Sequence, residues 1–99
     1  MVKRMVAWNF KEGLTEGEKK EQAQKIKAEI EGLVGLIDGV LELKVEINLL
    51  PSSTREILLN GLYESPEALE AYVVHPEHQR VAGFVGGLLQ DRVCIEYLA

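Results

Sequence analysis

The stretch Val40–Asn48, VLELKVEIN, has the most regular alternation of apolar and polar residues in the chain. Alternate side chains of an extended backbone point to opposite faces. The pattern therefore separates an apolar from a charged set: Leu41, Leu43, Val45 and Ile47 against Glu42, Lys44 and Glu46. This period of two predicts a β-strand with one buried face. After a loop at Pro51–Thr54, the segment Glu56–Glu64 (EILLNGLYE) is expected to be its antiparallel neighbour.

A strand and a helix are predicted before this strand pair. Val2–Phe10 contains Val, Met, Trp and Phe, and Lys11–Gly13 follows it, which is typical of a strand that ends in a turn. Thr15 and Glu18, three residues apart, have the spacing of a capping box. We therefore expect a helix from Glu16 to about Val34.

A second helix and a last strand are predicted after the strand pair. Ser65 is suited to the N-cap, and Pro66 to the first helical position. Pro76 disfavours helical geometry at His75, so the helix is expected to bend and restart there. The restarted part has an apolar stripe that consists of Val81, Val85, Leu88 and Leu89. Arg92–Leu98 is then the closing strand.

The order β-α-β-β-α-β predicts an α+β fold, the ferredoxin-like plait, in a single domain over residues 1–99. In this fold two helices cover one face of a four-stranded antiparallel sheet and leave the other face open. We expect the side of the first strand that carries Arg4, Val6, Trp8 and Phe10 to lie on the open face. That side is too apolar to remain in water, so either a ligand or a second subunit should cover it. We expect the second subunit, which would form a homodimer.

Charge and cysteine content narrow the class of partner and compartment. The 99 residues include 11 Lys+Arg and 16 Asp+Glu, for a net charge of −5. This balance argues against nucleic acid and against an anionic membrane surface as partners. The single cysteine, Cys94, forms no internal disulfide, and no apolar run approaches the ~18 residues of a membrane helix. We expect a cytoplasmic protein.

The segment Ala71–His78 contains both histidines of the chain and one of its tyrosines. A histidine can accept and return a proton near neutral pH, and a nearby tyrosine can donate a hydrogen bond to a developing oxyanion. A structural alternative is that His75 caps the restarted helix and that His78 is a surface residue. With Glu77 the histidines make only half of a zinc site, so neither a metal nor another cofactor is expected.

Arg4 and Trp8 are candidates for ligand binding on the first strand. A buried arginine needs a carboxylate or an anionic ligand. Glu42, Glu46 or an acid of the partner subunit is the expected partner of Arg4, and an anionic ligand is the alternative. Trp8 is a candidate stacking wall for a ligand, although an aromatic residue on a sheet face is more often interface packing.

The segment Ser65–His78, SPEALEAYVVHPEH, resembles the stress-responsive dimeric α/β-barrel (Dabb) family, and further similarity lies at Met1–Val6, Phe10–Gly13, Gly35–Val40 and Cys94–Tyr97. The resemblance implies two ferredoxin-like subunits that join their open sheet faces and close a barrel. Some similar plant proteins are polyketide cyclases that transfer protons with a histidine and a tyrosine of this motif, which implies Tyr72 and His78 here, with His75 nearby. Family members often have a histidine where this chain has Arg4, and arginine is no base at neutral pH.

Together these observations predict a homodimer that binds a small molecule between the sheet and the second helix, close to Arg4, His75 and the Tyr72–His78 pair. If the protein is an enzyme, we expect cyclase-like or isomerase-like proton transfer without a cofactor, with His78 as the base and Tyr72 orienting the oxygen. The alternative is a structural or stress-associated assembly protein whose motif histidines serve the fold.

Overall fold

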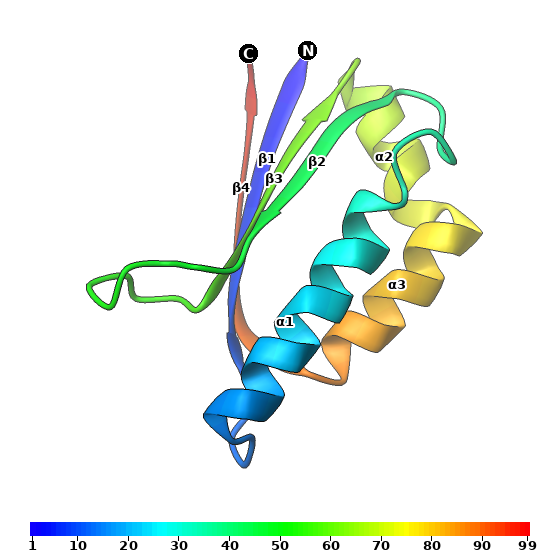
Figure 1. Ribbon diagram of the computed structural model, residues 1–99. Coiled ribbons are helices and arrows are strands. Elements are labelled where there is room, and N and C mark those ends of the chain that lie inside the picture. The colour runs from blue at the N-terminus through cyan, green and yellow to red at the C-terminus, as the bar shows by residue number, and fades with distance from the viewer.

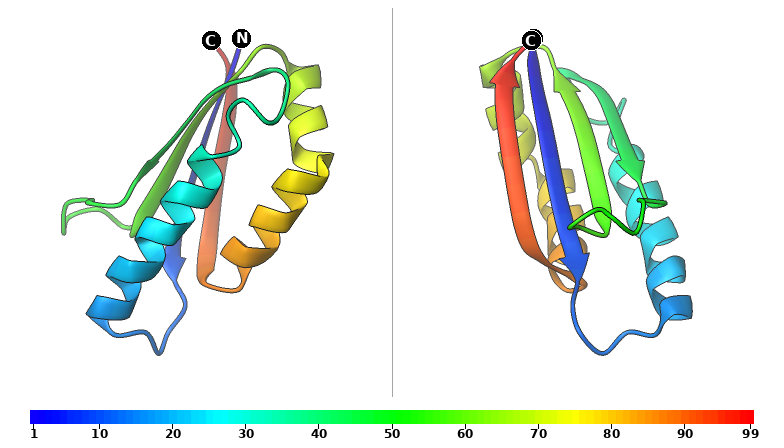
Figure 2. Two further views of the ribbon diagram at one scale, coloured as in Figure 1. Left: turned by 45° about the vertical axis from the view of Figure 1, so that its right-hand side comes forward. Right: turned by 90° about the vertical axis from the view of Figure 1, so that its left-hand side faces the viewer.

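The computed structural model describes residues 1–99, in which three helices cover one face of a four-stranded antiparallel sheet (Figure 1). The strand order is β2-β3-β1-β4, and the right view of Figure 2 shows the sheet from its open side. The elements are β1 (Val2–Phe10), α1 (Glu16–Glu31), β2 (Val40–Glu46), β3 (Ile57–Tyr63), α2 (Pro66–Val74), α3 (Pro76–Gly86) and β4 (Leu89–Leu98). The predicted ferredoxin-like fold is confirmed.

The starts of the helices follow the predicted capping signals. At α1 the Glu18 N–H donates to Thr15 Oγ1 at 3.1 Å, and the Thr15 N–H donates to Glu18 Oε1 at 3.0 Å. At α2 the Ala68 N–H donates to Ser65 Oγ at 3.1 Å, and Pro66 occupies the first turn. Each cap satisfies amides that have no partner inside the helix, so short local signals fix where both helices begin.

The end of α3 differs from the prediction. Leu88 and Leu89 were expected on the helical stripe, but α3 ends at Gly86 and Leu89 is the first residue of β4, paired with Phe10. The two successive glycines, Gly86 and Gly87, explain the difference because glycine disfavours helix continuation. The closing strand is therefore three residues longer at its start than the predicted Arg92–Leu98.

The side chain of Leu41 in β2 lies on the face opposite to the predicted one. The register between β2 and β3 shifts between Val40 and Glu42, and Leu41 is 44 % exposed, while Leu43 and Val45 are buried. A bulge of this kind adds one residue to a strand and reverses the alternation beyond it. The prediction that Leu41 shares the buried face was therefore wrong.

The outer edge of β2 is covered by α1. Lys27 Nζ donates to the Val45 carbonyl at 2.6 Å, and the Val45 N–H donates to Glu31 Oε2 at 2.8 Å. Lys27 and Glu31 also pair with each other at 2.7 Å. These side chains satisfy an edge-strand amide and carbonyl that would otherwise be free to pair with another strand.

The face of β1 that meets the helices is the opposite of the predicted one. Val2, Arg4, Val6, Trp8 and Phe10 are all buried in the single chain and lie beneath the helices. The apolar stripes of the helices need an apolar partner surface, and this set of β1 side chains supplies it. The expectation that Arg4, Trp8 and Phe10 point to the open face was therefore wrong.

The open face nevertheless carries apolar side chains, which come mainly from β4. Met5 pairs with Ile95, Lys3 with Tyr97 and Ala7 with Val93 in the β1–β4 register, and directly opposed residues share a face. The larger exposed members are Met5, Val93, Ile95 and Tyr97, which we call the open-face patch. Ile95 is 57 % exposed. An apolar open face is therefore present, with other residues than those predicted.

The two ends of the chain lie side by side (Figure 1). Val2 pairs with Leu98, and the Ala99 N–H donates to the Met1 carbonyl at 2.9 Å. The segment between β2 and β3 projects away from the helices. No helix of the structure combines the length and the apolar character needed to span a bilayer.

Candidate functional site

A cavity of about 200 Å³ lies between the sheet and α3. Its polar and aromatic lining consists of Arg4 and Trp8 from β1, Tyr72 from α2, His78 from α3, and Arg92 from β4. Apolar side chains of α1, β3 and α3 complete the wall. Four of the five predicted site residues are thereby brought together at one cavity, in the region where the pocket was expected.

The interruption between α2 and α3 fixes the orientation of His78. In a continuous helix the Val73 carbonyl would accept from the Glu77 N–H, but that N–H donates to His75 Nδ1 at 3.1 Å instead. The freed carbonyl accepts from His78 Nδ1 and from Gln79 Nε2, both at 2.9 Å. A carbonyl oxygen can only accept, so Nδ1 of neutral His78 carries the proton and Nε2 has a free lone pair.

The surroundings of His78 favour its neutral form. Burial is the largest effect and lowers the pKa of His78 below its ordinary value, and the positive charges of Arg4 and Arg92 act in the same direction. The hydrogen bond to Val73 opposes this shift but does not cancel it. Near neutral pH the imidazole is therefore present as a base.

Tyr72 lies between His78 and a second buried tyrosine. The Tyr72 and His78 ring centroids are 4.4 Å apart with the planes at 48°, and Tyr63 and Tyr72 are 5.1 Å apart at 56°. Burial, followed by the proximity of Tyr63, raises the pKa of Tyr72 well above its ordinary value. Tyr72 thus keeps its proton and is able to donate a hydrogen bond to an oxygen atom in the cavity.

Arg4 has a different partner from the predicted ones. It is only 8 % exposed, and its Nε lies 3.1 Å from Glu96 Oε2 on the neighbouring strand β4. The Nε–H is not aimed at this oxygen and has no hydrogen-bond acceptor in the chain. Glu42 and Glu46 lie on β2 and form no ion pair with Arg4. The expected partnership with either of them was wrong, because the β1–β4 register brings Glu96 to Arg4.

Sequence reasoning missed Tyr63, Arg92 and Glu96. Tyr63 is fully buried, its hydroxyl has no hydrogen-bond partner, and its ring folds across Gly61, the residue opposite Arg4. A Cβ at Gly61 would lie 2.8 Å from the Tyr63 hydroxyl oxygen. A glycine within an otherwise regular strand indicates the close approach of another group, and this signal was available in EILLNGLYE.

His75 lies outside the cavity lining, and its position fits the structural alternative. It is the N-cap of α3, where its Nδ1 accepts from the Glu77 N–H, and it also ends α2. No three His, Cys, Asp or Glu side chains of residues 1–99 form a group suited to a metal ion. Cys94 is exposed on β4.

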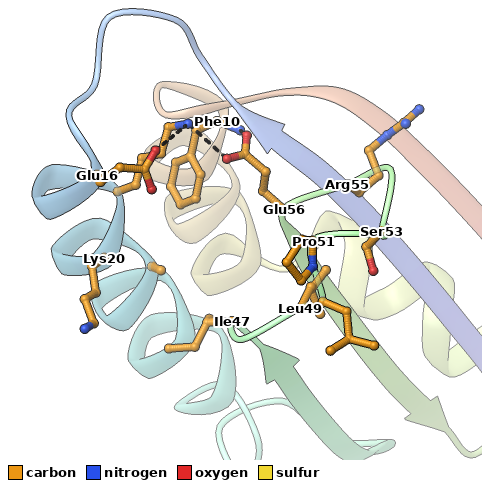
Figure 3. A pocket seen from close by; sticks show the side chains of 12 residues that line it. Phe10, Glu16, Lys20, Ile47, Leu49, Pro51, Ser53, Arg55 and Glu56 are labelled. Carbon is orange, nitrogen blue, oxygen red and sulfur yellow. Dashed lines mark hydrogen bonds and ion pairs between the residues drawn. The ribbon is translucent and has the colours of Figure 1, made fainter.

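A larger hollow of about 560 Å³ lies between the start of α1 and the segment that follows β2 (Figure 3). Lys19 pairs there with Glu56 at 3.0 Å and with Glu16 at 3.7 Å. Glu56 also accepts from the Phe10 N–H at 3.0 Å. These charges satisfy one another, and none of the predicted site residues lies there. The smaller cavity beside α3 is therefore the candidate site.

Comparison with known proteins gives a family and a set of similar folds. The profile of the stress responsive A/B barrel domain (Dabb) family matches residues 2–99. A dimeric protein of unknown function with a ferredoxin-like fold from Bacteroides fragilis is 24 % identical, with a TM-score of 0.90 over 99 % of this chain and 95 % of that chain. A protein of Arabidopsis thaliana is 22 % identical, with a TM-score of 0.83 over 100 % and 95 % of the two chains.

Another similar structure has a different description. A protein of Deinococcus radiodurans, described as a candidate antibiotic biosynthesis monooxygenase, is 17 % identical, with a TM-score of 0.77 over 100 % of this chain and 92 % of that chain. No curated protein sequence is significantly similar to this one. At these identities the structural matches show the fold.

Proposed function

The chain belongs to the stress responsive A/B barrel domain family, and we propose that it is a homodimer that binds a small carbonyl compound beside α3 and transfers a proton on it without a cofactor. Dimerisation is supported by the open-face patch, because exposed apolar side chains gathered on one sheet face mark an interaction surface. The similar protein from Bacteroides fragilis is described as dimeric. The proposed interface joins the open faces of two sheets.

The observation that carries the proposed chemistry is the orientation of His78. Its Nδ1 is held by Val73, so Nε2 is the atom available to take a proton from the carbon next to a carbonyl group. The electron pair of that C–H bond moves onto the carbonyl oxygen, and the Tyr72 hydroxyl donates a hydrogen bond to the resulting enolate. Return of the proton from Nε2 to another carbon of a conjugated enolate re-forms the carbonyl group and completes an isomerisation. In a ring closure the enolate carbon instead attacks a second carbonyl carbon of the same substrate, and the oxygen of that carbonyl takes the proton from Nε2.

Exchange of α-hydrogen for deuterium tests this proposal. Cyclohexanone, whose size suits the cavity, is incubated with the protein in D2O, and the loss of its α-proton signal is followed by NMR. The wild-type protein is expected to accelerate exchange, His78→Gln to lose about 100-fold or more of that acceleration, and Tyr72→Phe to lose less. Gln79→Ala is the matched control, because Gln79 binds the same carbonyl but does not line the cavity.

Exchange by wild type that is no faster than exchange by His78→Gln would contradict the proton-transfer role. This outcome would favour the second candidate function, a structural or stress-associated assembly protein. The capping contact of His75 and the Val73 contact of His78 support that candidate, since both join the ends of α2 and α3. In that case His78→Gln lowers the melting temperature and leaves the rate of deuterium exchange into cyclohexanone unchanged.

A further inference from the structure

The cavity contains more positive charge than the chain itself neutralises, and we infer that its ligand is a small carboxylate with an apolar or aromatic body, which replaces Glu96 as the partner of Arg4. This inference rests on the proposed small-molecule cavity. It is independent of whether His78 transfers a proton.

Arg4 is the first observation. A guanidinium has five N–H donors, and a buried charge is costly unless it is both paired and hydrogen-bonded. Arg4 is more than nine-tenths buried, it lines the cavity, and its Nε–H has no acceptor. A ligand carboxylate at this position would supply the missing acceptor in the two-bond geometry that suits a guanidinium.

Arg92 is the second observation. It lines the same cavity from β4 and forms no ion pair with any carboxylate of the chain. The charges of Arg4 and Arg92 both act on His78, whose pKa they help to lower. Two arginines from adjacent strands therefore give this end of the cavity a positive potential in a chain with a net charge of −5.

Glu96 has the position of a replaceable partner. Its side chain is 46 % exposed, whereas that of Arg4 is 9 % exposed, and only one of its oxygens approaches Arg4 Nε. An exposed carboxylate loses little when it moves into water. The rest of a ligand would lie against Trp8, Val81 and Val85. A cavity of about 200 Å³ suits a body the size of one aromatic ring.

Benzoate and benzamide are matched probes, since they share shape and differ in charge. Calorimetry on the wild-type protein is expected to show benzoate binding about tenfold more tightly than benzamide. Arg4→Met should remove this preference, and Arg92→Gln, at an exposed position, should reduce it several-fold. Glu96→Gln should tighten benzoate binding by removing the competing carboxylate and leave benzamide unchanged. Glu12→Gln, at an exposed acid that does not line the cavity, controls for net charge.

The outcomes separate the anion inference from the proposed function. Equal binding of benzoate and benzamide overturns the anion inference and leaves small-molecule binding intact. Binding of neither probe contradicts both. Benzoate preference that survives in Arg4→Met and Arg92→Gln also overturns the inference, because the charge would then be recognised elsewhere. If Arg4→Met does not fold, Arg92→Gln and Glu96→Gln still decide the question through opposite changes in benzoate affinity.

Discussion

Each face of the sheet carries an exception to the usual distribution of polar and apolar groups. The face beneath the helices contains a buried cation, Arg4, and a cavity, while the face toward solvent carries Met5, Val93, Ile95 and Tyr97. A buried charge and an exposed apolar patch are the informative exceptions in a folded chain. The comparison teaches that both faces are incomplete in the single chain: on one face the Arg4 Nε–H lacks a hydrogen-bond acceptor, and on the other the apolar side chains lack a covering surface.

The largest effect is expected from breaking the open face. Ile95→Glu places a carboxylate on each side of the proposed symmetric interface. Burial of these unpaired charges is expected to weaken the dimer by about 100-fold or more. Light scattering at micromolar concentration should change from twice 11.1 kDa for the wild type to 11.1 kDa for the variant.

Val74→Glu is the matched control for this prediction. Val74 is 70 % exposed on α2, away from the open face. This variant should remain a dimer. If the wild-type protein scatters light as a single 11.1 kDa species, the proposed dimer interface does not form. Dissociation of Val74→Glu but not of Ile95→Glu would place the interface on the helical side.

A moderate effect is expected from crowding the covered face. Gly61→Ala puts a Cβ within 3 Å of the Tyr63 ring, which is fully buried and cannot move aside. Overpacking of this kind costs about 1–3 kcal/mol. The free energy of unfolding, measured with urea, should fall by that amount.

Gly83→Ala is the control for Gly61→Ala, because a Cβ at Gly83 meets no atom within 4 Å. Gly83 lies inside α3, where alanine is favoured over glycine by up to about 1 kcal/mol. Its free energy of unfolding should therefore rise. If both glycine variants lose stability equally, the loss at Gly61 does not come from a clash between the new Cβ and the Tyr63 ring.

The smallest effect is expected from protonation of His78, which lines the cavity between the sheet and α3. The folded state lowers the pKa of His78 below its ordinary value of about 6.5, so below that pH the unfolded chain binds more protons than the folded chain. Stability from this group is full above about pH 6.5 and is lost as the pH falls through the lower, folded pKa.

The measurement is the difference in unfolding free energy between wild type and His78→Gln from about pH 8 to pH 5. This difference should shrink toward acid pH. The groups that face His78 are Tyr72, Arg4 and Arg92, and of these only the arginines are charged in this range. A difference that does not change with pH would mean that His78 keeps its ordinary pKa in the folded protein. Burial and the charges of Arg4 and Arg92 would then not disfavour its protonated form.

The order of elements was predictable because its signals are local. The Thr15 capping box, the Ser65–Pro66 start and the break at Pro76 each act within a few residues, and the structure has all three. The faces of β1 were not predictable in this way. The alternation along β1 shows that the Val6 side chain lies on one face of the strand and the Met5 side chain on the other. Which of these two faces meets the helices depends on packing between segments that are distant in the sequence.

The candidate site likewise combines residues that the sequence predicts with residues that it does not. Tyr72 and His78 lie on either side of one helix break, so their proximity follows from a short segment. Arg92, Glu96 and Tyr63 reach the site through strand register, which no local pattern specifies. The roles of Tyr72 and His78 in proton transfer remain predictions, as do the ligand contacts of Arg4 and Trp8.

The pairing of the first and last strands has a consequence for how the chain can be rewired. Because Met1 and Ala99 are joined by a backbone hydrogen bond, a short linker is able to connect them without disturbing β1 or β4. New ends can then be opened at Pro51–Thr54, in the exposed segment that projects from the sheet. A circular permutant of this design keeps every strand neighbour, and neither new end lines the cavity beside α3.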